Sequence, residues 1–407
     1  MSYDLEIATR VKPEQAQLDD FAARGKGLVL EGRLGGELTN VTVHKKTLFG
    51  RKPLVEVYAP IEAHEREDLD EGLATLVPPP CWLTQIAIPG FIEEGMRLGM
   101  ALAEHIADKC EGAVFDPQAA AVIWPKGKEV PTAAAPRKER IREVELEWYL
   151  APFRSGVEAA RILLIALKGR CPEAVPVRFG EYEPLQGHLE PGSDEPFFKA
   201  WEKASHDPLG TMFFKSKKPC FGGTIHVPGT MPPREGGTRA GVISLSFDGR
   251  IVCTDSRWRE TVSTLFVEVA RALQAFYARG CVCRDVIASR TGPVYDDKSE
   301  RYPSGFWKGA WRGIPSAPTW LAWFGPPYKA LVEESLPPDR SAVFPEGVLV
   351  RLGEEPLALD QLRGVFPSLP SQLLSGVQER VITLPTGRLV KVSPSAVKNA
   401  EFIPPLE

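Results

Sequence analysis

Residues 302–328 read YPSGFWKGAWRGIPSAPTWLAWFGPPY, and we expect this stretch to decide how the middle of the chain folds. Four of the nine Trp residues lie in it, namely Trp307, Trp311, Trp320 and Trp323. Glycines, among them Gly309 and Gly325, and repeated prolines exclude a long regular helix. Each buried indole N–H needs a hydrogen-bond partner. The pattern predicts an irregular, tightly packed segment of the core, with an aromatic recognition surface as the alternative.

Length and composition indicate a globular protein with two or three domains. The chain has 407 residues, 43% of them hydrophobic and 25% charged, which is ordinary for this class. The formal net charge of −4 does not favour direct binding to nucleic acid. The longest aliphatic run, Ile162–Leu167, is far shorter than the roughly 20 residues that a membrane span needs. The N-terminus lacks an apolar signal region and the seven Cys residues are scattered, so we expect a cytoplasmic protein with no membrane contact.

Working outward from the Trp-rich stretch, the pattern predicts an α+β fold built from two α+β domains. Each domain is expected to have a mixed or antiparallel sheet covered by helices. Residues 1–125 form the first domain, in which Phe91–Lys109 is predicted as a helix with one apolar face. Residues 126–138, KGKEVPTAAAPRK, have the composition of a linker.

The second domain is predicted at residues 139–340. In Arg142–Leu150 the apolar residues alternate with acids, which predicts a strand with one buried and one solvated acidic face. Arg257–Arg279 is predicted as the strongest helix, with Gly280 as its stop. Residues 341–407 form a small C-terminal extension, either a third unit or a tail packed on the second domain.

Sequence motifs typical of catalysis or metal binding are absent. The glycines of residues 32–36 are not followed by the Lys and Ser or Thr of a phosphate-binding loop, and no G-x-S-x-G or H-E-x-x-H pattern occurs. Cys281 and Cys283 have the wrong spacing for a zinc knuckle. We therefore predict no catalytic residue, no cofactor and no metal. An enzyme assembled only in three dimensions stays open, for example a hydrolase that uses the acids of Glu143–Glu147.

Several stretches of the second domain carry a resemblance to a known family. They are Arg178-Phe-Gly-Glu-Tyr-Glu-Pro184, Phe221-Gly-Gly223, the helix predicted at 257–279, Gly305-Phe-Trp-Lys-Gly-Ala-Trp-Arg-Gly-Ile-Pro315, and Trp320-Leu-Ala-Trp-Phe-Gly-Pro-Pro-Tyr328. With them, residues 140–340 resemble the immunity protein 52 family of bacterial polymorphic toxin systems. The fold signature of this resemblance is Trp307, Trp311, Trp320, Trp323, Gly309 and Gly325.

The resemblance implies an antidote that binds and neutralises a cognate protein toxin, often a nuclease, and has no enzymatic activity of its own. A nuclease presents a basic groove, so acidic loops of the antidote are the candidate toxin-binding residues. These are Glu181, Glu183, Glu190, Asp194, Glu195, Asp68 and Asp70. The alternatives are the hydrolase-like enzyme and a secretion-system adaptor that binds through exposed indoles. The sequence does not indicate which oligomeric state the protein has.

Overall fold

The computed structural model describes two compact units, residues 1–138 and 139–407. Described are all residues except 1, 35–39, 48–49, 65, 67–68, 90–92, 118–120, 127–138, 182–184, 190–191, 208–209, 229–237, 290–291, 308, 384–388, 399 and 407. Most of the expected linker therefore lies outside the described residues. Helices make up 30% and strands 39% of the structure, and the sheets are antiparallel for the most part, so the predicted α+β class is confirmed.

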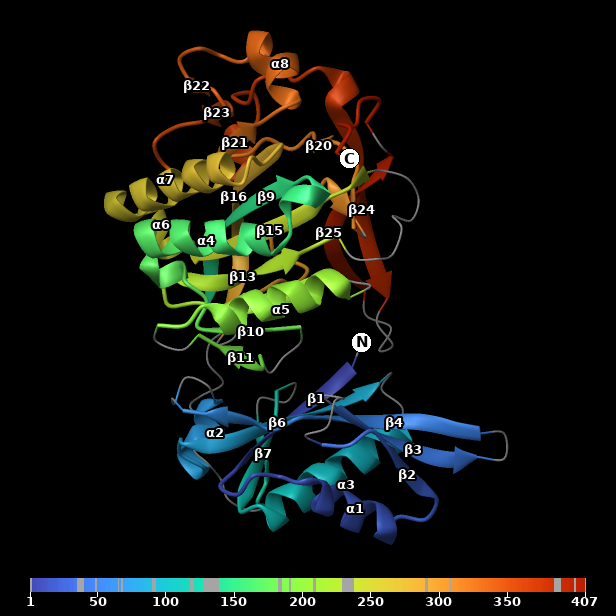
Figure 1. Ribbon diagram of the computed structural model, residues 1–407. Helices are drawn as coiled ribbons and strands as arrows, with labels where there is room; N and C mark the ends of the chain where they lie inside the picture. The colour runs from blue at the N-terminus through green and yellow to red at the C-terminus, as the bar shows by residue number, and fades with distance from the viewer. Residues whose placement is uncertain are drawn as a thin grey trace. The chain divides into compact units, whose positions relative to one another are not determined.

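The first unit (blue to cyan in Figure 1) is one sheet with helices on both of its faces. Its strand order is β2-β3-β4-β6-β1-β7-β8, with β5 beside β6. Helices α1 and α3 bury Leu18, Leu102 and Ile106 on one face, and α2 packs Leu73 against the other. Its elements are β1 (Ser2–Thr9), α1 (Gln15–Arg24), β2 (Leu28–Glu31), β3 (Asn40–Thr47), β4 (Gly50–Tyr58), β5 (Ile61–Ala63), α2 (Glu71–Leu76), β6 (Cys81–Pro89), α3 (Glu93–Lys109), β7 (Gly112–Asp116) and β8 (Ala121–Trp124).

The second unit is built on a long antiparallel sheet of order β11-β10-β12-β13-β15-β9-β16-β21-β23-β22, with β17 beside β16. Strand β9 lies near its middle and pairs with β15 and β16. The strands are β9 (Arg140–Leu150), β10 (Arg178–Gly180), β11 (Gly187–His188), β12 (Thr211–Lys215), β13 (Cys220–His226), β15 (Gly241–Asp248), β16 (Tyr277–Ser289), β17 (Gly292–Val294), β21 (Leu321–Phe324), β22 (Ser341–Phe344) and β23 (Gly347–Arg351).

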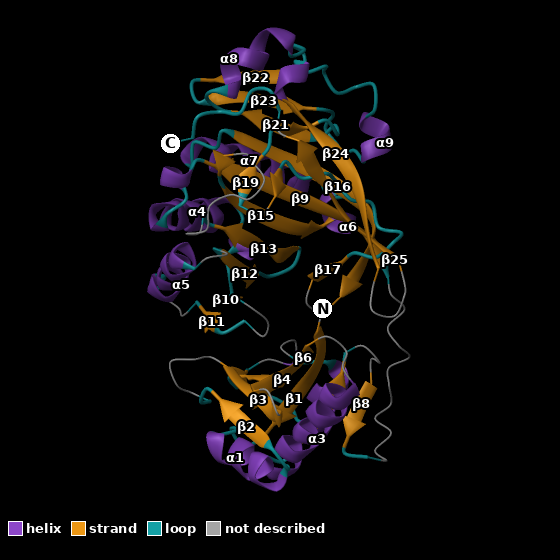
Figure 2. Cartoon of the chain, turned by 90° about the vertical axis from the view of Figure 1, so that its right-hand side faces the viewer, coloured by secondary structure: helices purple, strands orange, loops and turns teal. Residues whose placement is uncertain are grey.

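Helices cover one face of this sheet. The predicted alternation of β9 is present, because Val144, Leu146 and Trp148 are buried in the main core, and the Trp148 indole donates to the Phe266 carbonyl over 3.0 Å. Figures 1 and 2 show α4, α5 and α7 together on this side. The helices of the unit are α4 (Val157–Arg170), α5 (Glu195–His206), α6 (Gly249–Val252), α7 (Ser256–Ala272), α8 (Tyr328–Val332) and α9 (Leu359–Leu362).

The helix expected at Arg257–Arg279 is shorter than predicted. It ends at Ala272, the chain turns at Gln274 with a φ of 51°, and β16 starts at Tyr277. The apolar stripe continues through Leu273 and Phe276, which are buried in the turn and not on a helix face. As a result Arg279 and Gly280 lie inside a strand.

Residues 341–407 belong to the second unit. Strands β22 and β23 extend the long sheet beyond β21. The last strands form a hairpin, β24 (Leu374–Thr383) with β25 (Leu389–Lys398), and β24 also pairs in parallel with β20 (Ile314–Pro315). A further small sheet consists of β14 (Thr238–Arg239), β18 (Phe306–Trp307) and β19 (Ala310–Trp311).

The Trp-rich stretch forms part of the core. Trp311, Trp320 and Trp323 are fully buried. Their indoles donate to the Tyr328 hydroxyl over 2.9 Å, to the Gly353 carbonyl over 3.3 Å and to the Ala275 carbonyl over 3.1 Å, respectively. Trp307 is only partly buried. Three of the four indoles are thus inaccessible to a partner. Of these four, only Trp307 could contact a partner as the adaptor hypothesis requires.

Gly309 and Gly325 serve two different purposes in this stretch. Gly309 has a φ of 81°, a left-handed conformation that suits glycine in a tight turn. Gly325 packs so closely against the end of the α7–β16 turn that an added Cβ would lie 2.1 Å from the Ala275 carbonyl oxygen. Both are therefore determinants of the fold.

We expect Gly325→Ala to destabilise the second unit by about 2–4 kcal/mol, because backbone must move to admit the methyl group. Gly169→Ala is the matched control, since Gly169 is an exposed helix position with nothing within 4 Å of the added carbon, and it should gain up to about 1 kcal/mol. Urea unfolding measures both changes. Equal stability of the two variants would contradict the packing described for Gly325.

Candidate functional site

The face of the long sheet opposite the helices is polar. Glu143, Glu145 and Glu147 of β9 all point to it, and we call these three residues the acidic ladder. Beside them in register lie Cys283, Cys281 and Arg279 of β16. On the other side Ser246 lies opposite Glu145 and Ser244 opposite Glu147 on β15.

This acidic face is not the solvated one that the alternation predicts. Glu143 is only 2% exposed, the Glu147 side chain is 12% exposed, and Glu145 is half-buried. The reason is that residues 295–307 and 309–311, which we call the rim segment, fold over the ladder. The expectation of a plain solvated strand face is therefore wrong.

The rim segment contacts the polar face at several points. The Tyr295 hydroxyl donates to the Glu143 carboxylate, and the Pro303 carbonyl accepts a hydrogen bond from Arg279. The Trp311 ring packs on Tyr149 with the centroids 4.6 Å apart, and the ring of Phe306 lies 5.5 Å from that of His226. These contacts enclose the ladder along β16 and at both ends, with β15, β13 and β12 on the remaining side.

Arg279 is the buried cation that faces the ladder. Its side chain is 2% exposed and forms an ion pair with Glu147. Glu147 also accepts a hydrogen bond from the Tyr149 hydroxyl over 2.6 Å. A buried ion pair whose remaining lone pairs and protons are satisfied in this way is strongly destabilised when only one partner is removed.

Glu143 and Glu145 differ in how well their carboxyl groups are satisfied. Burial raises the pKa of Glu143, while hydrogen bonds from Ser246 and Tyr295 partly offset the rise. Burial, together with the negative charges of Glu147 and Glu143, raises the pKa of Glu145 well above its ordinary value. None of the residues that the structure describes donates a hydrogen bond to Glu145.

The chemistry available at this face is that of recessed carboxyl groups. Burial raises the pKa of the Cys281 and Cys283 thiols, so both stay protonated and are poor nucleophiles. Within the described part of the chain no group of three or more His, Cys, Asp or Glu side chains is placed to hold a metal ion. The ladder is suited to accept hydrogen bonds from a cation, or to supply a proton from Glu145.

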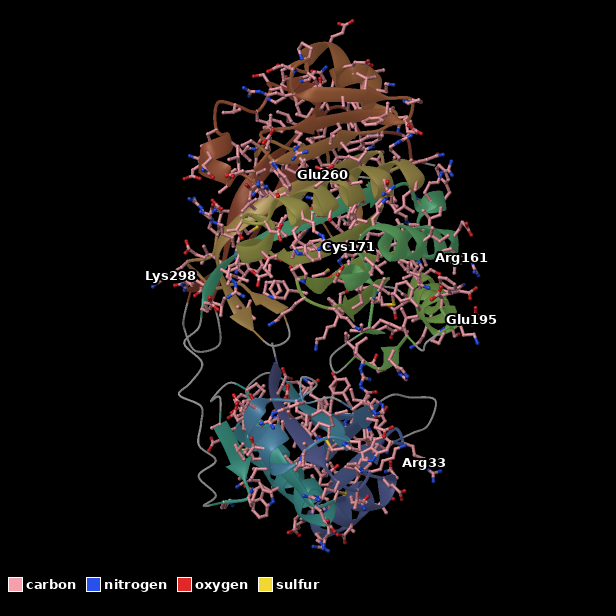
Figure 3. The ribbon with its side chains drawn as sticks, turned by 90° about the vertical axis from the view of Figure 1, so that its left-hand side faces the viewer. Arg33, Arg161, Cys171, Glu195, Glu260 and Lys298 are labelled. Carbon is pink, nitrogen blue, oxygen red and sulfur yellow. The ribbon has the colours of Figure 1, made fainter. Side chains whose placement is uncertain are left out.

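The acids predicted for toxin binding lie elsewhere. Glu181 forms an ion pair with Lys203 over 3.0 Å, and Asp194 one with Lys168 over 2.6 Å. Glu195 is exposed at the start of α5, and Figure 3 shows it on the helix-covered side. Asp70 caps α2 by accepting a hydrogen bond from the Gly72 amide over 2.7 Å. Glu183, Glu190 and Asp68 lie outside the described residues.

Arg279 was not predicted as a partner of the ladder, because the sequence pattern predicts this residue at the end of a helix. The available signal was the lone charge in the apolar run from Tyr277 to Val282. Tyr295 and Ser246 carry no comparable signal, since their contacts with Glu143 span 152 and 103 positions along the chain.

Comparisons with known proteins give little further information. No protein-family model and no curated protein matches the chain. Among solved structures, a T6SS protein of Pseudomonas aeruginosa is similar at 11% identity and a TM-score of 0.34, over 53% of this chain and 67% of that one. A likeness this low establishes neither fold nor function. No helix within the described ranges is long and apolar enough to cross a membrane.

We expect Arg279→Met to destabilise the second unit by about 3–5 kcal/mol, because it leaves the Glu147 carboxylate buried and without its cation. Adding Glu147→Gln should recover part of that loss, with a coupling energy of roughly 0.5–3 kcal/mol. Lys168→Met breaks the surface pair with Asp194 and should lose less than about 1 kcal/mol. Urea unfolding of the native chain, Arg279→Met, Glu147→Gln and the double variant gives the coupling energy, and strictly additive effects would contradict a buried pair.

Unlike Arg279→Met, Glu145→Gln should stabilise the second unit, and the size of this effect should depend on pH. The unfolded carboxyl titrates near its ordinary value of 4.5 and the folded one well above it. Between these values the folded chain binds the extra proton, so stability falls as the pH rises through the folded pKa. Glutamine is neutral throughout. The variant should therefore be more stable than the native chain at about pH 8, and the gap should close as the pH falls toward 4.5.

Urea midpoints at several pH values measure this gap. Glu195→Gln, at an exposed position of α5, is the control and should change stability by less than about 0.5 kcal/mol. A Glu145→Gln variant that is less stable than the native chain at high pH would show that Glu145 makes a stabilising contact.

Proposed function

We propose that this chain is an immunity protein that binds a cognate bacterial toxin and neutralises it. The observation that carries the proposal is where the residues of the resemblance lie. Phe179, Gly223, α7, Trp311 and Trp323 are far apart in sequence, yet all belong to the second unit. Residues that act as a fold signature should pack in this way, because they specify a scaffold and not a contact surface.

The packing of these residues supports this interpretation. The ring of Phe179 lies 5.3 Å from that of Phe197 on α5. A Cβ added to Gly223 would lie 1.8 Å from the Ser244 carbonyl oxygen. Trp311 packs on Phe276, just beyond α7, with the centroids 5.2 Å apart. Each contact joins a stretch that carries the resemblance to another part of the same core.

An antidote of this kind acts by forming a complex, so association rate and lifetime are what matter. The chain has a net charge of −4, and a nuclease has a basic groove for its substrate, so opposite charges would speed the encounter. The surface pairs of Glu181 and Asp194 are weak enough to exchange their lysines for partner cations at little cost. Glu195 is exposed and available without such an exchange.

Co-expression tests the proposal. The chain is produced in a susceptible bacterium together with the toxin encoded by the gene next to its own, and survival and co-purification are scored. We expect protection and a stable complex with the native chain, and weaker protection with the destabilised Gly325→Ala variant. Equal killing with and without the native chain, and no complex, would refute the proposal.

A second candidate, a hydrolase-like enzyme, is favoured by one observation. The pKa values of two carboxyl groups at the ladder, Glu143 and Glu145, are both raised, and perturbed pKa values are frequent at catalytic sites. Titration of toxin activity with purified chain distinguishes the two candidates. A stoichiometric inhibitor reaches full inhibition at a fixed molar ratio, whereas an enzyme that destroys the toxin or its product does so at ratios far below one.

A further inference from the structure

The described side chains around the acidic ladder donate hydrogen bonds to only two of its three carboxyl groups. Glu147 is held by Arg279 and Tyr149, and Glu143 by Ser246 and Tyr295. Glu145 lies between them, and no described residue donates a hydrogen bond to it. A recessed carboxylate without a donor is costly, and an unsatisfied polar group of this kind calls for an explanation, such as a functional role or a bound ion or water.

A second unsatisfied group lies next to the ladder. Tyr302 is 4% exposed, and its hydroxyl has no hydrogen-bond partner. It packs with Cys281 and Cys283, which are the register neighbours of Glu145 and Glu143 on β16. Two polar groups on the same part of the polar face thus lack partners, one from β9 and one from the rim segment.

The side of the ladder toward β15 and β13 is accessible. Ser244, Ser246 and Thr224 lie on this side with small side chains, and all three are half-buried, as is Glu145. Beyond them Phe213 of β12, opposite Thr224 in register, is 40% exposed. Phe213 therefore lies on an outer strand of this face, and Glu145 lies three strands further in.

We propose that this face is the docking site for an arginine-bearing segment of the toxin, with Glu145 receiving the cation. The inference rests on the proposed function and names the partner's chemistry. A guanidinium group carries five N–H donors in a fixed fork, so it can serve the carboxylate and a neighbouring oxygen at once. The aliphatic part of the arginine, or an adjoining apolar residue, would lie over Phe213.

The charge balance favours a cation over other occupants. Among the residues that the structure describes, Arg279 is the guanidinium that forms an ion pair with the ladder, and Glu147 and the Pro303 carbonyl already occupy it. An added cation relieves the repulsion among the three acids, whereas an anion or an apolar side chain would leave it in place. The acids on α5 and near Glu181, by contrast, have lysine partners or full solvation.

Two probes test this site on the full chain. The first is the purified, catalytically inactive toxin, and the second is a hexa-arginine peptide, both measured by calorimetry. Glu145→Gln should weaken each by tenfold or more, which corresponds to about 1.4 kcal/mol. Thr224→Arg, which places a cation on the same face, should do the same. Glu158→Gln, at an exposed position of α4 on the opposite side of the sheet, should change each affinity by less than twofold.

The outcomes separate the two proposals. If the toxin binds the native chain and Glu145→Gln equally well, docking at Glu145 is refuted and the immunity function stands. If the toxin does not bind the native chain, the immunity function is refuted. The peptide then decides whether the face binds arginine at all. Peptide binding that is equal in the native chain, Glu145→Gln and Thr224→Arg refutes the site in either case.

Discussion

The buried ion pair of Arg279 with Glu147 is the interaction on which the polar half of the second unit depends. Arg279 belongs to β16, Glu147 to β9, and the guanidinium also binds the Pro303 carbonyl of the rim segment. One side chain therefore ties two central strands to the segment that covers them. Desolvating such a pair is expensive, and the geometry must hold for the attraction to compensate it.

The other face of the same sheet depends mainly on the hydrophobic effect. Trp148 and its neighbours on β9 pack under α4 and α7, and Trp320 and Trp323 are fully buried in the same core. Strand β9 thus has one side that is apolar from Val144 to Leu150 and another side on which carboxyl groups are recessed but not fully satisfied. The recessed carboxyl groups on the polar side lower the stability of the second unit, and such locally destabilising groups are typical of functional surfaces.

Much of the fold could be predicted from the sequence, because local hydrophobic patterns and turn residues determine the type of many helices and strands. The alternation in β9 and the apolar stripe of α7 gave the correct element types, and the Gly and Pro spacing around the indoles predicted a buried segment. The end of α7 could not be predicted, since the apolar stripe continues through Phe276 and only the turn at Gln274 interrupts it.

The burial of the acidic ladder could not be predicted from the sequence either. It depends on Tyr295 and Pro303, whose contacts with β9 and β16 cross long stretches of chain, and a strand with alternating acids looks the same whether solvent or a rim segment covers it.

Hydrogen–deuterium exchange of the chain, alone and with the proposed toxin, tests most directly the proposal that the polar face of the second unit is the binding surface. The account predicts slower exchange on binding in β12, β13 and the rim segment, with no change in α4 and α7 on the opposite side. Protection confined to the helices, to α5 and its acidic neighbours, or to the first unit would contradict it.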